Sequence, residues 1–277
     1  HSLIMTTPPQ TDGCIAAEVL VAADICGVTK IIKAGGAQAI FSLALGTETV
    51  PKVDKIVGPG NRYVNEAKKM VYGHVDIDKP AGPSEVLVYC NKKAYASYAA
   101  SELLAQLEHD PDASAYAIAC SESLLKAINT HFSEQLKYCK RQDILKKSLK
   151  NAKLFYVKNE EAAIEAINSL ANEHLVLLVD HALALKDKIK HAGSIFCGPF
   201  SPVALGDFWA GPNHVLPTQR AARFSSPLGV HDFMKYSSYL SYSKEALKQA
   251  APQIKPLIAA EQLDAHWNSI QQRLTHP

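Results

Sequence analysis

A glutamine and a histidine in this sequence have the types and spacing of metal ligands. Gln106 and His109 are three residues apart near the end of a helix predicted over residues 93–107, so they share one face. Histidine is the commonest metal ligand, and a glutamine carbonyl can add an oxygen. The spacing by itself favours a simpler interpretation, an ordinary polar helix end before the turn at 110–112.

A second pair, Glu173 and His174, stands where an apolar strand is predicted to begin, at 174–179. Adjacent residues on an extended chain point to opposite sides, but both can line a pocket if they lie in the loop before the strand. A carboxylate and an imidazole together can relay protons. A solvated turn at 172–174 is an equally good interpretation of these residues.

The segment 201–214 gathers further polar groups. Asp207, Asn213 and His214 lie there among four glycine and proline residues. A long structured loop is uncommon unless it is functional, so Asp207 and His214 are candidates for metal or substrate contacts.

Polar residues near the C-terminus form a fourth candidate group. Glu261 and His266 are five positions apart, with Asp264 between them. Residues at that separation do not share one helix face, so a joint role requires a bent or loosely wound segment. The simpler interpretation is that they are solvated positions on a helix.

Two glycine-containing turns each follow a predicted strand and precede a predicted helix. One ends at Gln38 (35–38) and the other at Asn61 (58–61). Glycine lets a backbone approach a ligand closely, and a helix start attracts phosphate. Neither turn is a G-x-G-x-x-G fingerprint and the sequence has no Walker A motif, so these residues alone identify no nucleotide site.

Strands and helices alternate along the first two hundred or so residues. Short apolar runs separated by helical patterns predict buried parallel strands, and the fold class is therefore α/β. Ligands in such sheets bind at the carboxyl ends of the strands, so polar residues after strands are the first candidates. After about residue 229 the pattern changes to a Ser/Tyr-rich segment and a helical stretch from Lys244 to near Leu274.

The composition excludes several classes of protein. The chain has 277 residues, 47% of them hydrophobic, and a net charge of +2. It is neither disordered nor collagen-like, and no apolar run is long enough for a membrane span. The near-neutral charge argues against a nucleic-acid binder.

The six cysteines include no C-x-x-C pair and are interpreted as buried thiols in a reducing, cytoplasmic protein. The chain opens at His1 directly into a strand-like run and has no visible secretory signal. We therefore expect further sequence upstream.

Seven short strings, in order along the chain, resemble the histidinol dehydrogenase family. They are Gly35-Gly36-Ala37-Gln38-Ala39-Ile40, Pro51-Lys52-Val53-Asp54-Lys55-Ile56-Val57-Gly58-Pro59-Gly60-Asn61, Ala81-Gly82-Pro83-Ser84-Glu85, Gln106-Leu107-Glu108-His109, Asn172-Glu173-His174, Asn213-His214-Val215-Leu216-Pro217-Thr218 and Ala222-Arg223-Phe224-Ser225-Ser226-Pro227. The resemblance extends from Pro8 to about Trp267.

The resemblance implies a zinc- and NAD-dependent enzyme that oxidises L-histidinol to L-histidine through histidinaldehyde, the last steps of histidine biosynthesis. It implies that Glu173 and His174 are catalytic, with His174 as the base and Glu173 activating water, and that no cysteine acts as nucleophile. The implied zinc ligands are Gln106, His109, Asp207 and His266. Substrate contacts fall on these four residues and on Ser84, His174, His214 and Glu261, and cofactor contacts on Gln38 and Asn61.

The family resemblance also implies an architecture. We expect two Rossmann-like parallel-sheet domains, an incomplete NAD-side domain at 1–84 and a zinc and catalytic domain at 85–228. A C-terminal helical segment at 229–277 is expected to mediate a homodimer and to bring Glu261 and His266 into the partner's site. No nucleic acid or membrane partner is expected.

The sequence departs from the family in two places. The family's long N-terminal region, including a Tyr-x-Pro-Gly-Gly loop that helps to hold NAD, has no match, so we expect weakened NAD binding. Gly211-Pro212-Asn213 stands where the family usually has Thr before the Asn. The alternative hypothesis is a truncated, non-catalytic homologue that retains zinc or ligand binding, whereas the absence of H-E-x-x-H disfavours a zinc hydrolase.

Overall fold

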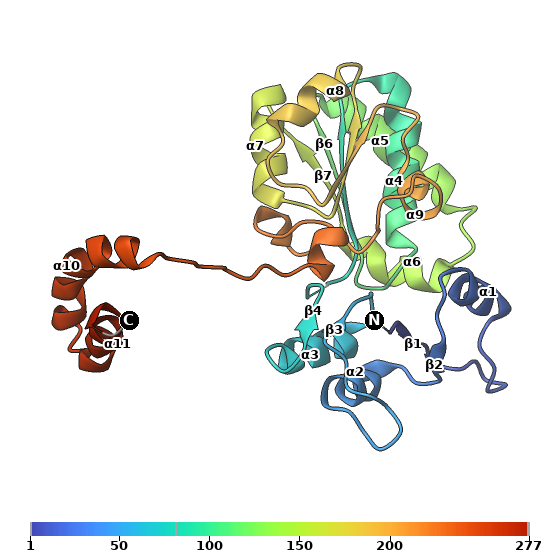
Figure 1. Ribbon diagram of the computed structural model, residues 1–277. Coiled ribbons are helices and arrows are strands. Elements are labelled where there is room, and N and C mark those ends of the chain that lie inside the picture. The colour runs from blue at the N-terminus through green and yellow to red at the C-terminus, as the bar shows by residue number, and fades with distance from the viewer. Residues whose placement is uncertain (1, 81, 276–277) are drawn as a thin grey trace. The chain divides into compact units, whose positions relative to one another are not determined.

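A five-stranded parallel sheet, with the order β7-β6-β5-β8-β9, forms the centre of the larger part of the molecule (Figure 1). The structure is a computed structural model that describes residues 2–80 and 82–275. The central strands are almost continuously apolar, as expected for a parallel sheet covered on both faces. The strands are β5 (Glu85–Cys90), β6 (Ser114–Ala119), β7 (Ala152–Tyr156), β8 (His174–Leu178) and β9 (Ser194–Cys197).

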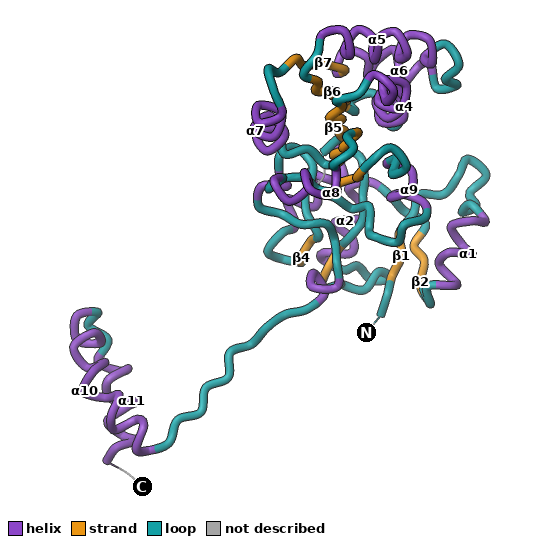
Figure 2. Tube along the Cα trace, turned by 90° about the horizontal axis from the view of Figure 1, so that it is seen from above, coloured by secondary structure: helices purple, strands orange, loops and turns teal. Residues whose placement is uncertain are grey.

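Helices cover both faces of this sheet, and Figure 2 shows β5, β6 and β7 between α7 on one side and the group α4, α5 and α6 on the other. Alternate side chains of β5 point to opposite faces of the sheet. Val86 and Val88 pack in the apolar cluster under α4 and α5. Leu87 and Tyr89 pack in the cluster under α7 and α8. The helices are α4 (Ala96–Leu107), α5 (Glu122–Leu136), α6 (Gln142–Ser148), α7 (Glu160–Leu170), α8 (Ala182–Leu185) and α9 (Val203–Phe208).

The first part of the chain has short parallel strand pairs, β1 with β2 and β3 with β4. A separate apolar cluster, which includes Ile40, Ala67 and Val71, packs its helices against the strands. The elements are β1 (Ile4–Thr6), α1 (Ala17–Ile25), β2 (Lys30–Ile32), α2 (Gly36–Leu45), β3 (Lys55–Ile56), α3 (Arg62–Val71) and β4 (Asp76–Ile77). The α/β class with parallel strands is confirmed.

The chain divides into two compact units, one ending at Asp232 and the other beginning at Phe233. The second unit holds α10 (Lys244–Ala260) and α11 (Asp264–Thr275), where the sequence predicted one helical stretch. The break at 261–263 contains Gln262 at a φ of 57°, a left-handed conformation that a continuous helix does not allow. Lys255 stacks over the Trp267 ring at 4.8 Å and joins the two helices.

Two helices of the structure, α6 and α9, were not predicted from the sequence, and both are short. The segment 201–214 was predicted as a loop, but α9 occupies six of its residues; α6 is likewise only seven residues long. Short 3-10 turns complete the fold: η1 (Lys93–Tyr95), η2 (Leu149–Asn151), η3 (Lys186–Lys188), η4 (Ala221–Arg223) and η5 (Val230–Phe233). Within residues 2–80 and 82–275, no helix is long and apolar enough to cross a membrane.

Candidate active site

A cavity of about 910 Å³ brings together most of the candidate residues of the first unit. One wall is the turn after β3, and other lining residues lie just before β5 and at the start of β8. The lining residues of the β3 turn follow a strand, as expected for ligand contacts, whereas the large sheet contributes residues at the amino ends of β5 and β8. The cavity is lined by Asn61, Ser84, Gln106, His109, Glu173, His174, Asp207 and His214, among others.

The main chain of Glu85 holds both residues of the proposed catalytic pair. Its N–H donates to Glu173 Oε2 at 2.8 Å, and its carbonyl oxygen lies 3.1 Å from His174 Nδ1. A carbonyl oxygen only accepts, so this bond places the His174 proton on Nδ1 and leaves Nε2 free to act as a base. Glu173 Oε2 is also 3.4 Å from Nδ1, which places a carboxylate beside the imidazole.

His174 and Glu173 are both nearly buried, with 6% and 5% of their surface exposed. Burial lowers the pKa of His174, but the hydrogen bond and negative charge of Glu173, together with the Glu85 carbonyl and Asp207, raise the pKa above its ordinary value. Phe196 packs with its ring centroid 6.0 Å from the imidazole and limits its movement. An imidazole held in this way, with Nε2 free, can accept a proton from a bound molecule.

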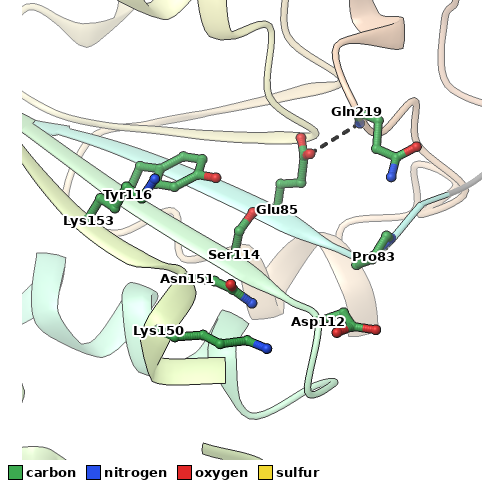
Figure 3. A pocket seen from close by; sticks show the side chains of 9 residues that line it. All are labelled: Pro83, Glu85, Asp112, Ser114, Tyr116, Lys150, Asn151, Lys153 and Gln219. Atoms are coloured by element: carbon green, nitrogen blue, oxygen red, sulfur yellow. Dashed lines mark hydrogen bonds between the residues drawn. The ribbon is translucent and has the colours of Figure 1, made fainter. Parts of the chain in front are cut away.

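Glu85 also contributes a carboxyl group that the sequence analysis did not identify. Its Oε1 accepts the Gln219 N–H at 3.2 Å, and burial, together with the nearby Glu173, raises the pKa of Glu85 to about 7 (Figure 3). The carboxyl lines a second cavity of about 290 Å³, where Lys150 and Lys153 are also found. A glutamate directly after Ser84, at the first position of a buried strand, was the available signal.

Gln106, His109 and Asp207 lie around the main cavity as two oxygen donors and one nitrogen donor, a set that zinc accepts. Gln106 is buried in the last turn of α4, and His109 is exposed in the turn that follows the helix. Across the described part of the chain, no three His, Cys, Asp or Glu side chains are grouped for a metal. The three residues therefore fit a metal only as a partial set that includes an amide and needs a further ligand.

Glu102 is the second functional candidate that the sequence analysis missed. This buried carboxylate accepts the Val203 N–H at 3.2 Å and so holds the start of α9, the helix that carries Asp207. Burial raises the pKa of Glu102 above its ordinary value, although the Val203 hydrogen bond and the charge of His174 act in the opposite direction. Glu102 lies four residues before Gln106 and seven before His109, so the three residues share one face of the predicted helix. This polar stripe on an otherwise apolar helix could have been detected in the sequence.

Comparison with known proteins identifies the family. The family model for histidinol dehydrogenase matches residues 1–274. The chain belongs to the histidinol dehydrogenase family.

Relatives and a solved structure agree with this family. The chain is 48% identical over 272 residues to a histidinol dehydrogenase of Oceanobacillus iheyensis and 48% identical over 275 residues to one of Halalkalibacterium halodurans. These matches cover 98% and 99% of this chain but 64% and 65% of those relatives. The crystal structure of histidinol dehydrogenase from Elizabethkingia anophelis matches with a TM-score of 0.90 and 37% identity, over 97% of this chain and 62% of that one. The chain thus spans just under two thirds of the length of its relatives.

Not all residues implied by the histidinol dehydrogenase resemblance lie around the main cavity. Gln38 is in the first turn of α2 and is not among the lining residues, whereas Asn61 lines the cavity and also caps α3 through bonds from the N–H groups of Tyr63 and Val64. Glu261 and His266 belong to the second unit, which is described by itself. Glu261 is the first residue of the break between α10 and α11, and His266 lies in the first turn of α11, so the segment between them is bent.

The six cysteines of this member of the histidinol dehydrogenase family differ in exposure and in acidity. Burial raises the pKa of Cys90 to about 11, so its thiol stays protonated at neutral pH. Cys14 and Cys26 are exposed, and the expectation of buried thiols was wrong for these two. None of the six is among the residues that line either cavity.

Proposed function

We propose that this chain carries the catalytic centre of an NAD- and zinc-dependent histidinol dehydrogenase, which oxidises L-histidinol to L-histidine through histidinaldehyde. The observation that carries the proposal is that the main chain of Glu85 binds both Glu173 and His174. These two side chains line the main cavity together with Ser84 and His214. A base with a fixed tautomer beside a carboxylate suits two successive oxidations, each of which releases a proton.

His174 is proposed as the proton acceptor in the first oxidation. Its Nε2 would take the alcohol proton, while the Glu85 carbonyl and Glu173 carboxylate stabilise the imidazolium through Nδ1. In the second oxidation, Glu173 would accept a proton from the attacking water. The burial of both side chains keeps bulk water from competing for these protons.

The proposed zinc ligands are Gln106, His109 and Asp207, joined by His266, and the proposed cofactor contacts are Asn61 and Gln38. NAD would accept the hydride and zinc would orient the substrate's imidazole and amine when each is bound. Ser84, His214 and Glu261 are proposed as further substrate contacts. Since Glu261 and His266 lie in a separate unit, we propose that a homodimer supplies them to the site, and that the enzyme is cytoplasmic.

NADH formation from L-histidinol, followed by absorbance, tests the proposal directly. This chain and one extended to the length of its relatives should be assayed in parallel, each with chelator and with zinc added back. Activity that is lost with chelator and restored by zinc supports the proposal. Activity in the extended chain alone would assign the function to the longer protein.

A non-catalytic, ligand-binding role is the second candidate, because the chain spans only 64% of its first relative. No activity in either chain, combined with retained zinc binding, would favour this role over the dehydrogenase.

A further inference from the structure

A buried ion pair contacts the turn at 58–61, which forms one wall of the main cavity. Lys68 Nζ contacts Asp78 Oδ1, and the two side chains are 3% and 0% exposed. Lys68 lies in α3 and Asp78 directly follows β4, so the pair links two elements of the first part of the chain. Taking two charges out of water is costly, and a buried pair is therefore weak evidence for stability alone.

The same pair binds both polar groups of one peptide residue in the turn. Lys68 Nζ donates to the carbonyl oxygen of Gly58 at 3.0 Å, and Asp78 Oδ2 accepts the Gly58 N–H at 2.8 Å. Asp78 Oδ1 also accepts the Lys79 N–H at 2.6 Å. Lys68 Nζ and Asp78 Oδ2 thus both bind Gly58 at the start of the turn, whereas Asp78 Oδ1 binds the backbone of Lys79.

Gly58 does not hold this geometry by its own conformational preference. Its φ of 121° lies in a region that glycine enters freely but in which it is not confined. The following residues, Pro59, Gly60 and Asn61, line the main cavity, and Asn61 caps α3. The position of this wall therefore depends on how Gly58 is held.

We propose that the Lys68–Asp78 pair is the positioning device for the 58–61 turn, and that through this turn it sets the affinity for the dinucleotide. This inference rests on the proposed function. Neither residue contacts the cavity, so they act through Gly58 as positioning residues and leave the proton chemistry of His174 untouched.

Paired apolar replacement separates positioning from stability. Lys68→Met and Asp78→Leu each leave one buried charge unpaired and should lower both the unfolding temperature and NAD affinity. In the double variant no charge is left unpaired, so the unfolding temperature should return towards the wild-type value. Its NAD affinity should stay about tenfold low, because Gly58 has lost both its charged partners.

Three measurements decide the outcome: calorimetric titration with NAD, hydrogen exchange at the Gly58 amide, and thermal unfolding. Lys92→Met is the matched control, because it breaks the exposed Lys92–Asp180 pair in the other part of the unit and should change none of the three by much. A double variant that is stable, binds NAD like the wild type and keeps Gly58 protected would overturn the proposal.

A second variant covers the case in which the double variant does not fold. Gly58→Ala leaves the ion pair intact, and its Cβ has open space, but it strains the turn at a φ of 121°. It should reduce NAD affinity by a similar factor with kcat largely retained, and wild-type affinity would contradict the proposal. If the wild-type chain binds no NAD, the proposed function and the proposed effect on NAD affinity are both contradicted. Hydrogen exchange at the Gly58 amide would still test whether the ion pair positions the turn.

Discussion

The carbonyl oxygen of Glu85 lies 3.1 Å from Nδ1 of His174, although the two residues are 89 positions apart in the chain. The parallel register of β5 and β8, in which Val86 pairs with His174, creates this contact. It sets the tautomer of the imidazole, and so determines which nitrogen can accept a proton from a bound substrate.

Replacing His174 with glutamine should abolish most of the proposed activity. Glutamine can keep a donor towards the Glu85 carbonyl but provides no base, so kcat for histidinol oxidation should fall by roughly 10²–10⁴-fold. His181→Gln is the control, since this histidine is exposed and pairs with Glu160 away from the cavities. Retention of wild-type kcat in His174→Gln would rule out His174 as the base.

The carboxyl of Glu85 should make stability depend on pH. Its pKa is raised from 4.5 to about 7 in the folded state, so between these pH values the folded chain binds more protons than the unfolded chain. The free energy of unfolding should therefore fall as pH rises from about 4.5 to about 7, by an amount on the order of 2 kcal/mol from this group.

Glu85→Gln should remove this contribution while keeping an acceptor for the Gln219 N–H. Urea unfolding at a series of pH values measures it, with the exposed Glu165→Gln as the control. The variant should gain stability relative to wild type as pH rises through this range. Parallel pH profiles for Glu85→Gln and wild type would contradict the raised pKa.

Gly193→Ala should displace Glu173 without changing any functional side chain. A Cβ at Gly193 would lie 2.5 Å from the Glu173 carbonyl oxygen, which is a backbone atom that cannot simply rotate away. We expect a loss of roughly 1–3 kcal/mol in stability and a fall in kcat of up to about 10²-fold. Gly229→Ala, where nothing lies within 4 Å of the added carbon, should have little effect on either quantity.

The proposed zinc site can be tested without turnover. Metal analysis after dialysis should show less zinc in His109→Gln and Asp207→Asn than in wild type, because each variant replaces an imidazole or a carboxylate with a neutral amide, which binds zinc more weakly. His214→Gln should keep its zinc and lose substrate affinity instead. Equal zinc content in all four proteins would exclude His109 and Asp207 as ligands.

The sequence by itself determined the local elements and the residue types of the site. Apolar runs such as 85–90 and 174–178 predicted the buried parallel strands, because burial on both faces leaves few polar positions. The Glu173-His174 pair could be recognised because the two residues are neighbours in the sequence and need no folding to come together. Seven short strings in the order of the family indicated the family.

Only the tertiary structure decided how distant residues meet. The register between β5 and β8 brought Glu85 to Glu173 and His174, and the packing of α4 on α9 brought Glu102 to the start of the helix that carries Asp207. The large sheet contributes residues at the amino ends of β5 and β8 to the cavity, whereas ligands in open sheets generally bind at the carboxyl ends. Such contacts depend on strand order and register, which arise from long-range packing and leave no signal in local spacing.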